Sequence, residues 1–122
     1  MYAHGIFMWV AFTVCGLLQI ISARYMGTFY EWRTYLHQVS GWLMVFLSFT
    51  AVGFAYMNAG YTLRLNYHSI SGLATASQIP IVAILAMIAQ SSRYSPTEWS
   101  TNFVRTMSDV HKYHGYAVIG LS

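Results

Sequence analysis

Histidine is the residue type in this 122-residue chain that is best suited to chemistry. Three of the five histidines begin the same pattern, H-x-x-x-G, in which the glycines are Gly41, Gly72 and Gly115. Residues four apart lie on one face of a helix, about one turn from each other. Each glycine therefore leaves the position one turn after a histidine without a side chain. Imidazole is a common metal ligand. The pattern therefore predicts histidines on helices, each with room beside it for a flat macrocycle that holds a metal ion.

The composition indicates which elements position these histidines. Hydrophobic residues make up 57% of the chain and charged residues 7%, against roughly 45–50% and 25% in soluble domains. The nine charged residues leave three charge-free stretches, residues 1–23, 37–63 and 65–92. Each is at or above the roughly 20 residues that a membrane-spanning helix needs. We therefore expect a multi-pass integral membrane protein that contacts lipid.

The first two helices are predicted over residues 3–25 and from residue 28 to about residue 60. Gly27 follows the first as a helix stop. Thr28 and Glu31 have the spacing of a capping box at the start of the second. At about 30 residues, the second helix is longer than a membrane requires, so its first turns should project through the headgroups.

The third helix is predicted to follow Asn66 and to reach about Gln90, with a kink at Pro80. Residues 95–98 then combine a capping box with proline at the first helical position. A short amphipathic helix on the membrane surface should follow, and the fourth span should begin near Ser108. The expected fold is all-α: a membrane-embedded antiparallel four-helix bundle with a short interfacial helix between the third and fourth spans.

The two ends of the chain bear on its domain organisation. The last apolar run, residues 114–122, is too short to cross a membrane, and His4 lies almost at the first residue. We therefore expect residues 1–122 to form one transmembrane core that is incomplete at both ends.

Antiparallel threading pairs the histidines by level, since each lies near the start of a predicted helix. The first and third helices start on one side of the membrane, and the second and fourth on the other. His4 therefore shares a level with His68, and His37 shares a level with His111 or His114. His111 is favoured because it stands four residues before Gly115. Two facing imidazoles form a bis-histidine haem site.

The haems would be held without covalent bonds. Cys15 is the single cysteine, and no C-x-x-C-H sequence is present. The prediction is two b-type haems per chain, with His4, His68, His37 and His111 as the iron ligands. Zinc binding is a less favoured interpretation of these histidines, because a closed zinc site needs four ligands.

The basic residues predict the orientation in the membrane. Five of the six lie on the side where the second and fourth helices start: Arg24, Arg33, Arg93, Arg105 and Lys112. The positive-inside rule then places loops 26–34 and 91–108 on the cytoplasmic-equivalent side. Arg24 is the candidate partner for haem propionates, because the end of the first helix reaches the level of His37. The basic residues are too dispersed to form a nucleic-acid interface.

The chain resembles the cytochrome b561 family, in particular the membrane core that is found attached to DOMON domains. The resemblance spans nearly the whole chain. It is carried by Ala3-His4-Gly5-Ile6-Phe7-Met8, Ala23-Arg24-Tyr25, Tyr35-Leu36-His37, His68 with Gly72, and His111 with Gly115-Tyr116. It implies a six-helix protein of which these are the central four helices. It also implies one haem on His4 and His68, and another on His37 and His111.

The resemblance implies electron transfer across a membrane, often from ascorbate to ferric or radical acceptors. Two positions depart from the family pattern: Tyr35 replaces a basic residue, and Tyr94 replaces the proline after Arg93. These departures argue against ascorbate as the donor. The enzyme class implied is a transmembrane oxidoreductase of the ferric or monodehydroascorbate reductase type.

Two other functions stay open, as does assembly into a homodimer or a larger membrane complex. The chain could be a haem-bearing membrane-anchor subunit of a respiratory complex, which would exchange electrons with quinone. Alternatively, it could be a haem-free structural membrane subunit whose histidines join helices by hydrogen bonds.

Overall fold

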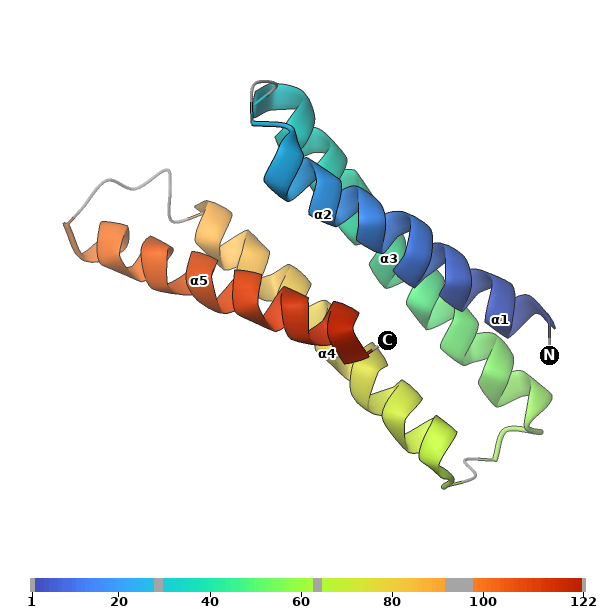
Figure 1. Ribbon diagram of the computed structural model, residues 1–122. Coiled ribbons are helices and arrows are strands. Elements are labelled where there is room, and N and C mark those ends of the chain that lie inside the picture. The colour runs from blue at the N-terminus through green and yellow to red at the C-terminus, as the bar shows by residue number, and fades with distance from the viewer. Residues whose placement is uncertain (1, 28–29, 63–64, 92–97, 122) are drawn as a thin grey trace. The chain divides into compact units, whose positions relative to one another are not determined.

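The computed structural model describes residues 2–27, 30–62, 65–91 and 98–121, and these residues are almost entirely helical, with no strand among them. The elements in chain order are α1 (Tyr2–Trp9), the π-helix η1 (Val10–Cys15), α2 (Gly16–Tyr25), α3 (Tyr30–Asn58), α4 (Tyr67–Ser91) and α5 (Glu98–Leu121) (Figure 1). The all-α prediction is confirmed. The chain divides into two compact units, Met1–Ala76 and Ser77–Ser122, and α4 runs through the boundary between them.

Three helical stretches are long and apolar enough to cross a membrane. They are Tyr2–Tyr25, in which α1, η1 and α2 follow one another without a break, Glu31–Asn58 and Tyr67–Gln90. These bounds agree with the first three predicted spans to within a few residues. The described residues therefore support a membrane protein, as the charge-free stretches predicted.

In the first unit, the helix formed by α1, η1 and α2 packs against α3 in the opposite direction. His4 near its start contacts Ala51 in the second half of α3, whereas Gln19 near its end contacts His37 and Met44 in the first half. The chain reverses after Tyr25, where Met26 and Gly27 leave the helix. We call this pair of helices the hairpin (Figure 1, blue against green).

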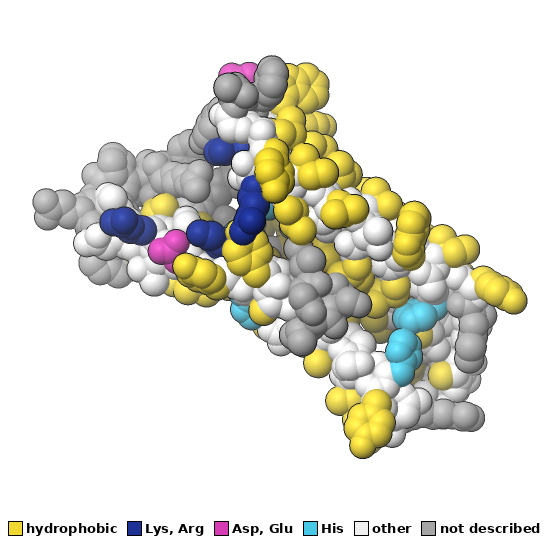
Figure 2. Space-filling view, in the orientation of Figure 1, with side chains coloured by type: hydrophobic (Ala, Val, Ile, Leu, Met, Phe, Trp, Pro, Cys, Tyr) yellow, Lys and Arg dark blue, Asp and Glu magenta, His cyan; other side chains and the backbone are white. Residues whose placement is uncertain are grey.

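Small side chains form the contact inside the hairpin. Ala11, Ser22 and Ala51 are fully buried, and the largest side chains that are almost completely buried are Cys15, Ser22 and Ser48. Large apolar side chains instead lie on the outside, and Figure 2 shows them along the length of the hairpin. A soluble core buries its large apolar residues, whereas membrane helices pack through small ones. This inverted distribution supports lipid as the surroundings of the hairpin.

The π-helix η1 lies within this contact. Ala11 and Cys15 of η1 form a buried cluster with Met44 and Leu47 of α3, and Phe7, Val10 and Phe12 pack around it. Sequence analysis predicted an uninterrupted α-helix here. No proline or unusual residue type in this stretch signals the wider turn of a π-helix. Short π-helical turns inside α-helices are frequent near functional sites.

Local motifs fix two helix ends. After α3, the amide of Gly60 donates to the carbonyl of Met57, and that of Tyr61 donates to Tyr56, as in a Schellman motif. Gly60 and Tyr61 both have positive φ, 67° and 59°. This confirms the predicted end of the second span.

Before α4, Asn66 acts as the N-cap. Its Oδ1 accepts a hydrogen bond from the Ser69 amide at 2.8 Å, and the Ser69 hydroxyl accepts one from the Asn66 amide at 3.0 Å. The helix that follows continues through Pro80. The capping boxes predicted at residues 28–31 and 95–98 include residues outside the described part of the chain.

The prediction of a separate interfacial helix before a fourth span at Ser108 is wrong. The structure has one helix, α5, from Glu98 to Leu121. No glycine or proline lies between Glu98 and His114 to end a helix, so the amphipathic turns continue directly into the apolar ones. Within α5, the Thr106 hydroxyl donates a hydrogen bond to the Asn102 carbonyl, so this polar side chain has a partner in its own helix. Packing of all four helices into one bundle stays a prediction.

The small-residue contact predicts that Ala11→Leu destabilises the hairpin. Ala11 is fully buried against α3, and adding bulk to a close-packed contact costs about 1–3 kcal/mol. Thermal unfolding in detergent should show a lower midpoint. The matched control is Ala23→Leu, at an exposed position of α2, which should leave the midpoint nearly unchanged. Equal effects of the two substitutions would contradict the packing described here.

Candidate functional site

Two of the predicted ligand histidines lie side by side in the first unit. The ring centroids of His4, in α1, and His68, in the first turn of α4, are 6.0 Å apart, and the ring planes are inclined by 86°. His4 is partly buried and His68 is exposed. The two residues are 64 positions apart in sequence, so the fold brings them together, as antiparallel threading predicted.

His4 is held in place by α3. Its Nδ1 lies 2.9 Å from the carbonyl oxygen of Ala51. A carbonyl can only accept a hydrogen bond, so Nδ1 carries a proton, and in the neutral ring the lone pair is on Nε2. Metal-binding histidines in general use their second nitrogen in this way, which fixes the tautomer and the ring orientation.

The separation of His4 and His68 suits one metal ion between the rings. Two imidazoles bound on opposite sides of a metal, with bonds of about 2.0–2.1 Å, have ring centroids roughly 6 Å apart. A Cβ atom added at Gly5 or at Gly72 would meet no atom within 4 Å, so open space borders the helix positions next to His4 and one turn after His68. The residue types and separation of this pair are compatible with histidine ligation of a haem iron, which they would hold through their imidazole nitrogens.

His37 of α3 contacts the end of the first span. Its Nδ1 lies 3.3 Å from the carbonyl oxygen of Gln19 and 3.3 Å from the hydroxyl oxygen of Ser22. The Ser22 hydroxyl donates its own proton to the Gln19 carbonyl at 3.0 Å. The Gln19 carbonyl can only accept, so Nδ1 of His37 carries a proton, and in the neutral ring the lone pair is on Nε2, as at His4.

The three H-x-x-x-G glycines are not equivalent. A Cβ atom at Gly41 would lie 3.5 Å from Nε2 of Gln19, and the same amide donates to the sulfur of Met44. The 3.5 Å separation is an ordinary van der Waals distance, so Gly41 lies beside the Gln19 side chain. A Cβ atom at Gly72 or Gly115 would meet nothing within 4 Å, so open space borders these two glycines.

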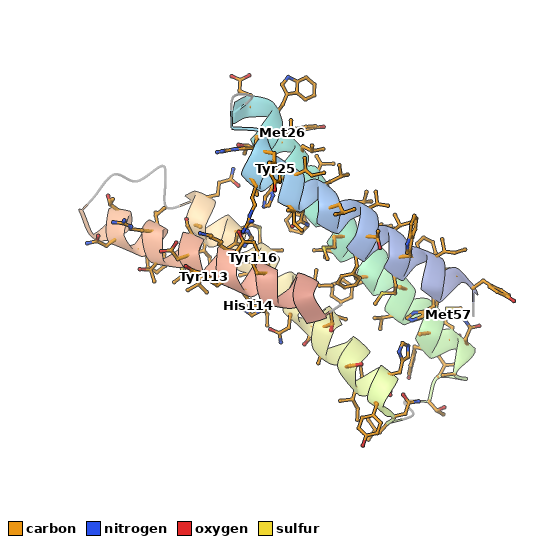
Figure 3. All side chains as sticks on the ribbon, viewed as in Figure 1. Tyr25, Met26, Met57, Tyr113, His114 and Tyr116 are labelled. Carbon is orange, nitrogen blue, oxygen red and sulfur yellow. The ribbon has the colours of Figure 1, made fainter. Side chains whose placement is uncertain are left out.

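His111 lies in the second unit and contacts α4. Its Nδ1 is 3.0 Å from the carbonyl oxygen of Val82. His114 instead lines a shallow hollow along α5 with Thr106, Asp109, Val110 and Tyr113. Figure 3 shows the labelled Tyr113, His114 and Tyr116 on α5. The two histidines of α5 therefore have different surroundings, and the bond of His111 matches those of His4 and His37. Pairing of His37 with His111 joins the two units and stays a prediction.

Arg24 lies in the last turn of α2 and is exposed. It follows Ser22, which contacts His37, by two residues. Arg24 therefore lies at the end of the hairpin that holds His37, and its role toward a haem propionate stays a prediction.

Larger metal clusters do not occur in the described part of the chain, where no group of three or more His, Cys, Asp or Glu side chains could hold a metal ion. Comparisons with protein-family models, with curated proteins and with solved structures give no match to this chain. The resemblance to the cytochrome b561 family therefore stays a prediction.

The groups that hold the histidines could not be predicted from residue type, with one exception. The acceptors are the backbone carbonyls of Gln19, Ala51 and Val82. Every residue has such a carbonyl, so the residue type does not indicate which one accepts a hydrogen bond. Ser22 could have been found, since it is a small polar residue in an apolar helix at the predicted level of His37.

The hydrogen bonds predict the tautomers of the neutral histidines in haem-free protein. His4 and His111 should carry the proton on Nδ1, because each Nδ1 faces a backbone carbonyl at about 3 Å. Long-range ¹H–¹⁵N correlation spectra at alkaline pH distinguish the two ring nitrogens. His114, for which the described residues 2–27, 30–62, 65–91 and 98–121 show no such carbonyl bond, is the comparison within α5 and should favour the Nε2–H form. An Nε2–H form of His4 would contradict the structure.

Proposed function

We propose that this chain transfers electrons across a membrane through two bis-histidine b-type haems. One haem would be held by His4 and His68, and the other by His37 and His111. Electrons would pass from a reductant on one side to ferric iron, a radical or an attached redox domain on the other. The observation that carries the proposal is the His4–His68 pair, whose 6.0 Å ring separation suits one iron ion.

Haem, when bound, supplies the one-electron couple of its iron. The work of the protein is to hold and orient the ligands. The bonds from His4 to Ala51 and from His37 to Gln19 and Ser22 fix two rings against the opposite helix of the hairpin. Such bonds also raise the basicity of the ligand nitrogen, which influences the reduction potential of a bound metal.

The two ligand levels are well separated along the hairpin. His37 and Ala51, which receives the His4 bond, are 14 residues apart on α3. At a rise of 1.5 Å per residue, this is about 21 Å along the helix. The hydrocarbon core of a bilayer is about 30 Å thick. Sites at these two levels would therefore lie toward opposite faces of the membrane, as transfer across it requires.

The resemblance to the cytochrome b561 family supports the same assignment. In that case, the chain belongs to a transmembrane oxidoreductase of the ferric or monodehydroascorbate reductase type. Tyr35, in place of the basic residue of the family pattern, is exposed in α3 and argues for a donor other than ascorbate.

A haem-free structural subunit is the second candidate function. It is favoured by the same three hydrogen bonds, because each joins a histidine of one helix to a carbonyl of another. The two candidates differ in haem content, which decides between them.

The first test is a reduced-minus-oxidised visible spectrum of the full chain in detergent, with haem quantified as the pyridine haemochrome. Two b-type haems per chain are expected. His4→Phe or His68→Phe should each remove one haem, and combining the two should remove no more. His37→Phe and His111→Phe should remove the other haem. The matched control, His114→Phe, should keep both haems. Protein with native helicity and no haem would favour the structural subunit.

The second test measures transfer across a bilayer. Vesicles that contain the protein and trapped ferricyanide should reduce it when dithionite is added outside, faster than vesicles without protein. His4→Phe should lower the rate to that of protein-free vesicles, because one site of the relay is lost, whereas His114→Phe should not. Equal rates for His4→Phe and the unaltered chain would argue against transfer through the His4–His68 site.

A further inference from the structure

One polar side chain inside the hairpin lacks a partner. Ser48 of α3 is 2% exposed, and its hydroxyl oxygen is buried without a hydrogen bond to any residue in the described part of the chain. A hydroxyl that is buried in this way loses its hydrogen bonds to water and gains none in return. Buried polar groups in folded proteins therefore nearly always have a partner, which is either a protein group or an ordered water molecule.

A second serine on the same helix shows the usual behaviour of a hydroxyl in this environment. Ser40 lies two turns earlier and is also 2% exposed. Its hydroxyl donates to the carbonyl of Leu36 at 2.7 Å. Thr50 bonds the carbonyl of Phe46 in the same way, at 2.8 Å. Both bonds run to the carbonyl four residues earlier, as is common for hydroxyls inside helices. Ser48 differs from both neighbours, because its hydroxyl does not bond its own helix.

Ser48 lies at the level of the π-helix η1. The preceding residue, Leu47, packs in one buried cluster with Ala11 and Cys15 of η1. Ala51, one turn further along α3, accepts the hydrogen bond from α1. In the first unit, α1, η1 and α2 pack against α3. A buried residue between Leu47 and Ala51 on α3 therefore faces η1 or the turn next to it.

The π-helical turn changes the partners of backbone groups at this level. An amide donates to the carbonyl four residues earlier in an α-helix and five residues earlier in a π-helix. Where the second pattern returns to the first, two carbonyls compete for one amide. At the end of η1, the Gly16 amide donates to the Thr13 carbonyl, only three residues earlier. The end of a π-helix thus supplies a backbone carbonyl that can accept a further hydrogen bond.

We propose that one water molecule is bound inside the hairpin, between Ser48 and the backbone of η1. The Ser48 hydroxyl donates to the water, and the water donates to a carbonyl of η1. Both polar groups then have a partner, which direct contact between them does not provide. Buried waters generally serve this purpose, with about three hydrogen bonds each. The inference rests on the packing of the hairpin and not on the proposed function, so a chain without haem would retain the water.

The position of Ser48 relates this water to one of the two histidine levels. Ala51, whose carbonyl holds His4, follows Ser48 by three residues, which is about 4.5 Å along the helix. His37 precedes Ser48 by 11 residues, about 16 Å. The water therefore belongs to the backbone that supports His4 and not to the contact of His37.

Water-edited solid-state NMR of the full chain in lipid bilayers tests the site directly. Magnetisation is transferred from water to serine Cβ atoms that carry ¹³C. Ser22 and Ser40 are the matched controls, because each is buried and donates to a carbonyl of its own helix. At short transfer times, the signal of Ser48 should be severalfold stronger than the signals of the two controls. Equal signals from the three serines would overturn the proposal.

Thermal unfolding of two variants in detergent distinguishes the water from other states of the Ser48 hydroxyl. With water bound, Ser48→Ala removes the water and leaves a carbonyl of η1 without its partner, so the midpoint should fall. Ser40→Ala is the control and should leave the midpoint nearly unchanged, because its hydroxyl bonds only within one helix.

Two results of this comparison are incompatible with the proposal. A higher midpoint for Ser48→Ala would mean that the hydroxyl has no partner at all. A midpoint equal to that of Ser40→Ala would mean that the hydroxyl bonds its own helix at the Met44 carbonyl, four residues earlier. The NMR experiment uses the unaltered chain, so it decides the question even if Ser48→Ala does not fold.

Discussion

The close approach of α1, η1 and α2 to α3 through small side chains is the constraint on which the rest of the first unit depends. Lipid chains are as apolar as leucine, so burying large apolar side chains between membrane helices gains little. Ala11, Ser22 and Ala51 let the two backbones come close enough for side chains to reach carbonyls across the contact. His4 reaches Ala51, and His37 reaches Gln19, across this contact. Most of the large apolar side chains are then left on the outside of the hairpin.

The sequence was informative where the physical signal lies in residue type. Charge-free stretches of more than 20 residues predicted the three membrane-length helices, and Gly60 predicted the end of α3. Antiparallel threading predicted that His4 lies beside His68, and the structure places them so. Features that depend on packing could not be predicted from residue type. The π-helix arises in a stretch of ordinary residues, and α5 continues where a change in hydrophobic pattern suggested a break. The carbonyl partners of the histidines were invisible for the same reason.

One set of hydrogen bonds serves both candidate functions. In a haem-free subunit, the bonds from the Nδ1 atoms of His4, His37 and His111 would join helices. In a haem protein, the same bonds would orient the ligand nitrogens and fix their tautomers. A membrane helix pair that first used histidine for cohesion would thus already hold Nε2 in the form that binds a metal. The two functions differ in whether a haem binds to these histidines.

The π-helix makes the number of residues between Val10 and Cys15 as important as their identity. A π-helical turn accommodates one residue more than an α-helical turn. A related chain shorter by one residue in this stretch could close it as a regular α-helix. The part before the deletion would then rotate by about 100° relative to the part after it. His4 would turn away from Ala51 while Gln19 and Ser22 kept their positions against His37. Insertions and deletions in η1 therefore alter the alignment of the two histidine levels, even where every histidine is retained.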